Sequence, residues 1–346
     1  MITVLRAGPL TTVQDEGRPG YAHLGVPRAG ALDQPALRLA NALVGNDASA
    51  AGLETTLMGC RLRFESPATI AVTGAVCTVK IDGGLAGGPG PIAVPAGAVV
   101  EIGRATGGVR SYLAVAGGID VEPVLGSRST DTLSGLGPPR LTDGQTLAIG
   151  PMPNNPDKPA ELLARRVAEA ARDSADQVRG PGQASFVDRP GQSGPAGRLG
   201  GSERPGSATP PREPGRSGGA GQAARELEGS GVSAGRAEIV LGVWAGPRDA
   251  WVEVAGLFGD AYVISPMSNR VACRLAGTAL RRTRAGELPP EGLVLGAIQV
   301  PPDGQPLIFL ADHPTTGGYP VVGVVDDVAP LAQARPGTSV RFRELH

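Results

Sequence analysis

The chain has 346 residues, and its 32 basic and 33 acidic side chains leave a formal net charge of −1. A balanced charge excludes the overall attraction to nucleic acid or to an anionic membrane that a strongly basic protein has. No apolar run approaches the roughly 18 residues that a membrane-spanning helix needs. From the charge and the absence of such a run, we expect neither nucleic acid nor membrane as a partner.

Three isolated cysteines, Cys60, Cys77 and Cys273, are typical of a reducing compartment. Each lies in apolar sequence and no two have the spacing of metal ligands, so we expect buried thiols and no metal site. The first twenty residues contain neither a basic segment nor an apolar one, so no secretory signal is predicted. These features together predict a soluble, cytoplasmic protein.

The first predicted domain, residues 1–150, consists mostly of strands. Short segments rich in Val and Ile, separated by Gly and Pro, predict strands at 68–83, 97–105 and 110–119. One helix is expected, with Asp33 as its cap, Pro35 in its first turn and Gly45 at its end. Many short strands with little helix favour a β-barrel or sandwich.

Residues 151–236 form the second predicted segment. The sequence at 159–172 has apolar residues at helical spacing and predicts a helix. From residue 174 to 236 the chain is mainly Gly, Pro, Ser, Arg and Glu, which bury too little apolar area to offset the entropy of ordering. We expect a disordered linker there.

The third predicted domain, residues 237–346, is a second β-rich block. Strands are predicted at 237–246, 261–266, 292–301, 306–312, 317–326 and 338–345, with a short helix at 249–258.

Several common enzyme classes are excluded by the motifs that they require. The only lysines, Lys80 and Lys158, are in neither a Walker phosphate loop nor a Met-Lys-Met biotin site. The histidines His23, His313 and His346 lack the spacing of a zinc hydrolase, and no GxSxG elbow is present.

Two segments combine glycine and polar residues at unusual density, Gln14–Asp33 and Gly296–Pro320. Glycine lets backbone N–H groups approach a ligand, and Thr315 and Thr316 add hydroxyl donors. Composition alone is compatible either with binding loops or with ordinary turns.

These segments resemble signatures of a known family. Three segments are similar, in order, to motifs of the family of the 5-oxoprolinase C component: QDEGRPGYAHLGVPRAGALD (residues 14–33), GGIDVEPVLGSRSTD (117–131) and GAIQVPPDGQPLIFLADHPTTGGYP (296–320). This family is also known as the allophanate hydrolase subunit 2 or biotin-dependent carboxyltransferase family. SNRVACRLAG (268–277) falls where the family tends to have Ser-Asp-Arg-Met-Gly. Asn269, Val271 and Ala272 depart from that pattern.

The resemblance implies a mainly β fold of two cyclophilin-like β-barrel halves with few short helices, here with a long disordered insertion. It implies the C component of an ATP-dependent 5-oxoprolinase, which opens 5-oxoproline to glutamate together with an A and a B component. The B component is the expected direct partner. ATP is then a cofactor of the complex, with no biotin attached to this chain.

Two alternatives to that function stay open. One is a carboxyltransferase subunit acting on urea or a related amide. The other is a non-catalytic binding partner that regulates a kinase inhibitor resembling the B component.

Opening of a lactam and carboxyl transfer to urea both need fixed N–H, O–H and guanidinium donors around a carbonyl group. The candidate catalytic residues are Arg18, Asp33, Arg270 and Asp312. The candidate binding residues are Gly25, Pro27, Arg128, Asp131, Gln299, Thr315, Thr316, Gly317, Gly318 and Tyr319. We predict that the two glycine-rich segments face one another across a cleft between the halves, which is lined by Arg18, Asp33, Thr315, Thr316 and Tyr319. Asp33 could instead only cap a helix, and Arg18 or Arg128 could only brace a loop.

Overall fold

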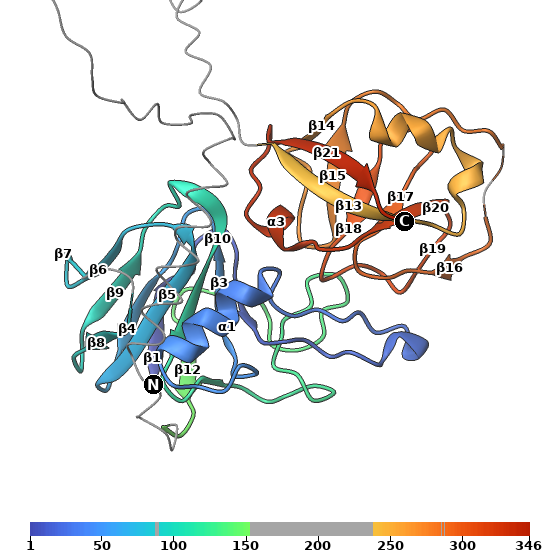
Figure 1. Ribbon diagram of the computed structural model, residues 1–346. Helices are drawn as coiled ribbons and strands as arrows, with labels where there is room; N and C mark the ends of the chain where they lie inside the picture. Colours follow the sequence, from blue (N-terminus) through green and yellow to red (C-terminus); the bar gives the residue numbers. More distant parts are fainter. Residues whose placement is uncertain (87–89, 153–237, 285, 287) are drawn as a thin grey trace, which may run out of the picture. The chain divides into compact units, whose positions relative to one another are not determined.

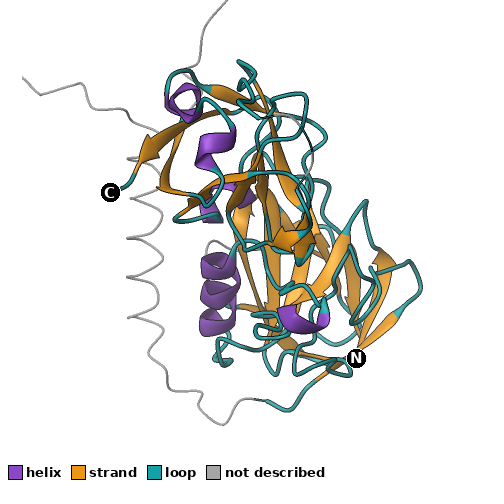
Figure 2. Cartoon of the chain, turned by 90° about the vertical axis from the view of Figure 1, so that its right-hand side faces the viewer, coloured by secondary structure: helices purple, strands orange, loops and turns teal. Residues whose placement is uncertain are grey.

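The computed structural model describes residues 1–86, 90–152, 238–284, 286 and 288–346. The helix expected at 159–172 and the linker expected at 174–236 lie outside the described residues. Strands dominate the rest, which confirms a mainly β protein (Figure 2). No helix among the described residues is long and apolar enough to cross a membrane.

The strands of the N-terminal half are divided between two antiparallel sheets (Figure 1). The larger sheet has the order β11-β12-β1-β4-β9-β6-β7. Its strands are β1 (Ile2–Arg6), β4 (Arg61–Phe64), β6 (Val79–Ile81), β7 (Gly84–Leu85), β9 (Val99–Ile102), β11 (Ile119–Asp120) and β12 (Thr146–Ile149). The smaller sheet has the order β2-β3-β10-β5-β8. Its strands are β2 (Thr11–Gln14), β3 (Gly52–Thr56), β5 (Ala68–Val76), β8 (Ile92–Val94) and β10 (Gly107–Val115).

A core of fully buried aliphatic side chains lies between these sheets. Ile2 of β1 and Leu62 of β4 come from the larger sheet, and Leu53 of β3 and Leu113 of β10 come from the smaller one. In β4 the burial alternates strictly, which is the period of a strand with one face on a core. The two sheets therefore form a sandwich around a shared apolar layer.

Helix α1 (Gln34–Leu43) forms where the sequence predicts it and packs against β5 and β10. The Asp33 carboxylate accepts the Ala36 amide, and Pro35 occupies the first turn, where its missing N–H costs nothing. Gly45 follows the helix with φ +78°, a left-handed conformation that glycine adopts without strain. The short 3-10 helix η1 (Ala22–Leu24) precedes α1.

The C-terminal half is a closed barrel of order β13-β20-β17-β18-β15-β14-β21. Its strands are β13 (Ile239–Ala245), β14 (Tyr262–Ile264), β15 (Ala272–Ala276), β17 (Ala297–Gln299), β18 (Leu307–Phe309), β20 (Val321–Val325) and β21 (Ser339–Glu344). The first and last strands pair in parallel and close the ring. A two-stranded ladder of β16 (Glu291–Gly292) and β19 (Thr316–Gly317) adjoins it.

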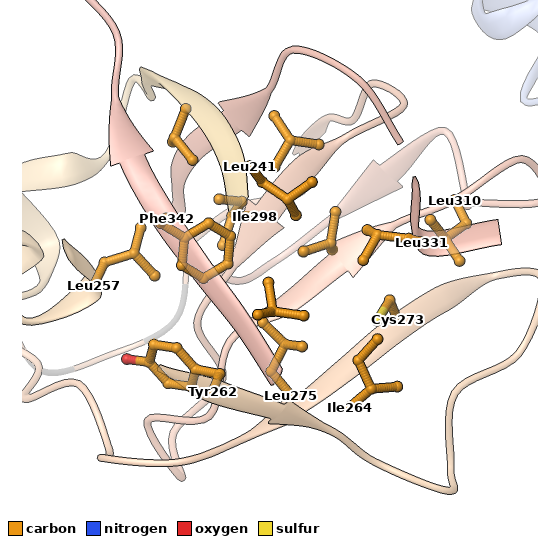
Figure 3. Packing of buried hydrophobic residues seen from close by; sticks show 14 of the residues in the cluster. Leu241, Leu257, Tyr262, Ile264, Cys273, Leu275, Ile298, Leu310, Leu331 and Phe342 are labelled. Atoms are coloured by element: carbon orange, nitrogen blue, oxygen red, sulfur yellow. The ribbon is translucent and has the colours of Figure 1, made fainter. Parts of the chain in front are cut away.

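The barrel encloses an apolar core that includes an aromatic pair (Figure 3). The rings of Tyr262 and Phe342 meet edge to face at 5.9 Å. Leu32, from the N-terminal half, also packs into this core, so the barrel holds the end of the first glycine-rich segment.

The single helix expected at 249–258 is instead two 3-10 helices, η2 (Asp249–Trp251) and η3 (Val254–Phe258). Val252 between them is extended and bridges to Arg282, which breaks the helical hydrogen-bond ladder. A four-residue helix, α3 (Ala329–Ala332), precedes β21.

The described residues all belong to one compact unit, and hydrogen bonds join its two halves. The Ala29 amide donates to the Ala311 carbonyl at 3.0 Å. The Arg110 guanidinium donates to the Ala332 carbonyl at 2.6 Å, and Gln333 accepts the amides of Val109 and Arg110. The two glycine-rich segments therefore meet where the halves join.

Candidate functional site

A buried arginine lies at the centre of the junction. Arg270 is 1% exposed and donates from Nε and Nη2 to the Asp312 carboxylate, both at 2.9 Å. Its Nη1 donates to Glu54 at 2.5 Å, and Nη2 also donates to the Gly30 carbonyl at 2.6 Å. Because Glu54 and Gly30 belong to the N-terminal half, one guanidinium ties the two halves together.

Glu54 on β3 is the second centre of this network. Its Oε2 accepts the Tyr112 hydroxyl at 2.7 Å and the Leu32 amide at 3.1 Å. The Arg110 guanidinium lies 3.5 Å from Oε1. Two carboxylates and two guanidiniums thus balance one another in a water-poor region, as buried charges require.

The electrostatics follow from that pairing. Burial alone would raise the pKa of Glu54, but Arg270 and Arg110 outweigh burial and hold the pKa below its ordinary value. Burial likewise opposes the charge on Arg270, yet Glu54 and Asp312 raise its pKa above the usual range. Glu54 and Arg270 therefore stay charged near neutral pH. Burial raises the pKa of Tyr112 well above its ordinary value, so its hydroxyl remains a donor.

Asp312 also links the halves directly, through Thr132 of the N-terminal half. Its Oδ2 accepts both the amide of Thr132 at 3.0 Å and the hydroxyl of Thr132 at 2.6 Å. Arg270 and Asp312 thus each make four hydrogen bonds to protein groups, which suits positioning of the surrounding loops.

A second cluster surrounds Asp15 in the first motif. Its carboxylate accepts the hydroxyls of Ser127 and Ser129, at 2.7 and 2.5 Å, and the amides of Gly17 and Arg128, at 2.8 and 2.5 Å. The first and middle motifs are therefore joined by one buried carboxylate that the sequence did not single out.

Arg18 is buried beside this cluster. Its Nε donates to the Val124 carbonyl at 3.3 Å and its Nη2 to the Ser129 carbonyl. Nη1 is buried with no protein partner within the described residues. Burial lowers the pKa of Arg18, against the pull of Asp131 and Asp15. These two hydrogen bonds brace the middle-motif loop, and contact of Arg18 with a ligand stays a prediction.

The remaining N-terminal candidates also make local contacts. Asp131 accepts the Leu133 and Ser134 amides and the Ser134 hydroxyl. Asp33 caps α1 and accepts from Gln333 at 2.8 Å, and burial raises its pKa. Gly25 ends η1 with φ +75° and is exposed, whereas Pro27 is buried.

The C-terminal candidates lie around β19. Gln299 is buried and donates to the Tyr319 carbonyl at 2.9 Å, and a Cβ on Gly317 would lie 2.7 Å from the Gln299 amide. Thr315 accepts the Leu293 amide through its carbonyl, and Gly318 accepts the Leu288 amide in the same way. Thr316 and Tyr319 are exposed. This set surrounds the β16–β19 ladder.

A cavity of about 150 Å³ lies where the two glycine-rich segments meet. Its polar lining residues are Arg28, Gln34 and Asp327. The rest of the wall is apolar: Ala29, Ala31, Leu32, Pro35, Leu295, Ala311, Val328 and Ala329. Both segments contribute to this wall, but it contains none of the residues predicted to line a cleft between them: Arg18, Asp33, Thr315, Thr316 and Tyr319.

A second cavity of about 260 Å³ lies in the N-terminal half. Arg128 lines it beside Asn46, Asp47 and Asp120, and its Nε donates to the Val121 carbonyl at 2.8 Å. The Asn46 side chain donates to the Val115 carbonyl and accepts the Gly117 amide. These hydrogen bonds hold the start of the middle motif and engage both ends of the carboxamide.

His313 is an ionisable residue of the third motif that is not among the candidates from the sequence. It is 6% exposed, and its Nδ1 lies 2.7 Å from the Pro314 carbonyl, which can only accept. Nδ1 therefore carries the proton, and Nε2 keeps its lone pair. Burial lowers the pKa of His313 and keeps the ring neutral near pH 7. No cluster of metal ligands occurs among the residues that the structure describes.

A model of the "Carboxyltransferase domain, subdomain A and B" family matches residues 24–192 and 207–344. The C component of the 5-oxoprolinase of Escherichia coli is 35% identical over 354 residues, which cover 99% of this chain and 90% of that protein.

Solved structures show the same similarity. The crystal structure of TTHA0988 is 29% identical, with a TM-score of 0.67, and the match covers 99% of this chain and 56% of that one. The urea amidolyase of K. lactis is 26% identical with a TM-score of 0.72 over 100% of this chain and 19% of that one. The chain thus spans little more than half of the first structure and about a fifth of the second.

Proposed function

The chain belongs to the carboxyltransferase domain family, subdomain A and B, and from that premise we propose that it is the C component of an ATP-dependent 5-oxoprolinase. In this proposal it acts with the A and B components to open the lactam ring of 5-oxoproline to glutamate. The family was predicted from the sequence motifs, and the match confirms it.

The observation that carries this choice of substrate is the cavity between the glycine-rich segments. Its wall is mainly apolar, with one guanidinium, one carboxamide and one carboxylate, from Arg28, Gln34 and Asp327. 5-Oxoproline has two ring methylenes, an amide edge and a carboxylate, and each has a counterpart in that wall. Urea is wholly polar and would leave the apolar wall without a partner. The extent of the match to the Escherichia coli protein, 90% of its length, favours the same role.

ATP does not fit the two cavities described above. Ligands of that size occupy sites of about 300–1,000 Å³, and the cavities measure about 150 and 260 Å³. We therefore assign ATP, whose phosphoryl transfer would activate the lactam carbonyl, to a partner component. This chain would bind and orient the lactam and shield it from water, with the Arg270 network holding the two segments in register.

The three cysteines are free thiols, which supports placement in the cytoplasm. A carboxyltransferase acting on urea is the second candidate, because the similarity to urea amidolyase extends over the whole chain.

The test is reconstitution from separate components. Complexes of the A and B components, with and without this chain, are assayed for ADP release that depends on 5-oxoproline. We expect turnover only when all three are present. Undiminished turnover without this chain would refute the proposal, and so would carboxylation of urea after a biotin carboxylase is substituted for the A component.

A further inference from the structure

Gln34 is a polar side chain of the cavity wall with a buried oxygen that no described residue satisfies. It is the first residue of α1, and its Oε1 is buried without a hydrogen-bond partner among the described residues. A buried carbonyl oxygen without a partner costs stability, and a turn of the carboxamide about its terminal torsion would bring this oxygen to the cavity, where a donor of a ligand could satisfy it.

The backbone at Gln34 is fixed by both halves of the molecule. The preceding residue, Asp33, donates its amide to the Tyr112 hydroxyl at 2.8 Å, and its carboxylate accepts from Gln333 at 2.8 Å. Its other carboxylate oxygen caps the helix through the Ala36 amide. The carboxamide of Gln34 therefore extends from a preorganised point, as a specificity group must.

A carboxamide offers one acceptor and two donors in a plane. A five-membered lactam cannot become trans, so its N–H and C=O lie on the same edge. The two groups can pair through two parallel hydrogen bonds, with Gln34 Oε1 accepting the lactam N–H and Nε2 donating to the lactam carbonyl. The terminal torsion of glutamine is broad, so the amide can turn its acceptor toward the cavity.

Arg28 supplies the complementary charge. It lines the same cavity, and a guanidinium binds a carboxylate with two parallel hydrogen bonds. Asp327, also in the wall, has its carboxylate engaged by the Ala329 amide and would repel a carboxylate placed beside it. The charges thus favour one orientation, with the ligand carboxylate toward Arg28.

We propose that Gln34 recognises the cis-amide edge of the lactam and that Arg28 recognises its carboxylate. This inference rests on the proposed function and assigns the residues that distinguish a lactam acid from its analogues.

The test compares 5-oxoproline with its lactone analogue, 5-oxotetrahydrofuran-2-carboxylate, in which oxygen replaces the N–H. In the reconstituted complex, Gln34→Leu should lower kcat/KM for 5-oxoproline about 10- to 100-fold, as loss of two neutral hydrogen bonds does. The apparent Ki of the lactone should change much less, because Gln34→Leu removes the hydrogen bond from Nε2 to its carbonyl but also the repulsion between Oε1 and the ring oxygen. The preference for lactam over lactone should therefore collapse.

A second arm tests the charge. Arg28→Met should raise KM for 5-oxoproline about 10- to 100-fold, while inhibition by 2-pyrrolidinone, which has no carboxylate, stays the same. Arg104→Met, at an exposed arginine outside the cavity lining, is the matched control. If Gln34→Leu folds poorly, Gln34→Glu replaces it in the comparison of 5-oxoproline with the lactone, because an acidic residue in the first turn interacts favourably with the helix dipole.

The outcomes are separable. A wild-type complex without 5-oxoproline-dependent ATP hydrolysis overturns the proposed function, and this inference falls with it. An active wild-type complex in which Gln34→Leu retains the lactam preference overturns the inference alone.

Discussion

Replacement of Arg270 by methionine should destabilise the protein strongly, because it removes the cation that two buried carboxylates share. Asp312 would lose two hydrogen bonds and keep only those from Thr132. Glu54 would lose its 2.5 Å contact and keep Arg110 at 3.5 Å. Leaving a buried charge without its partner costs about 3–5 kcal/mol, and we expect a loss of that size in the free energy of unfolding.

Urea titration followed by fluorescence and circular dichroism measures this loss. Both tryptophans, Trp244 and Trp251, belong to the C-terminal half, so fluorescence reports on the barrel and circular dichroism on the whole chain. Arg248→Met is the matched control, since its ion pair with Glu291 is on the surface and should matter little. Asp312→Asn added to Arg270→Met should recover about 1–2 kcal/mol by removing one orphaned charge.

The loss should also depend on pH with a defined sign. In the wild type the lowered pKa of Glu54 stabilises the folded state at pH values above the pKa of a glutamate in the unfolded state, about 4.3. This stabilisation is lost as the pH falls below that value toward the pKa of Glu54 in the folded state. Without Arg270, burial should raise that pKa above the unfolded value, so the folded variant binds the extra proton. The deficit of the variant should therefore shrink as pH falls from 7 to 5. A deficit no larger than that of Arg248→Met, or one independent of pH, would refute the reasoning.

Three other predictions follow from individual contacts. Arg18→Ala should lower the melting temperature of the isolated chain by several degrees, because Arg18 braces Val124 and Ser129; an unchanged melting temperature with lost turnover would restore its role as a ligand-binding residue. Asp33→Ala should cost about 1–2 kcal/mol in chemical denaturation through its helix cap and its bond to Gln333, and a cost additive with that of Gln333→Ala would contradict the shared bond. Burial raises the pKa of Cys60 to about 12 and of Cys273 to about 11, so iodoacetamide at pH 8 should label Cys77 alone in the folded protein by mass spectrometry, and labelling of Cys60 at a similar rate would contradict its burial.

Local sequence signals predicted much of the fold. Asp33, Pro35 and Gly45 marked α1 correctly, because capping and turn chemistry act over a few residues. The strand pattern indicated the mainly β class, and the motifs indicated the family. The break at Val252 was missed, since it depends on a bridge to Arg282, thirty positions away.

The site was less accessible to sequence reasoning. Arg270 and Asp312 were identified as charged motif residues, but their partner Glu54 lies in a strand where a lone glutamate usually faces solvent. Nothing local shows that Glu54 faces Arg270, 216 positions later, because register and the meeting of two halves are long-range properties. Gln34 was hidden for a similar reason: only the three-dimensional cavity distinguishes it from any other residue at a helix start.

Closure of the C-terminal barrel has a consequence for how other chains could associate with this protein. A ring of paired strands offers no open edge to an incoming strand, whereas the two N-terminal sheets end at β7, β11, β2 and β8. Within the described residues, partners that add a strand, and accidental aggregation by the same route, are therefore confined to the edges of the N-terminal sheets and of the short β16–β19 ladder. Contacts with the barrel must be made through side chains and loops, which diverge in sequence more readily than backbone pairing does.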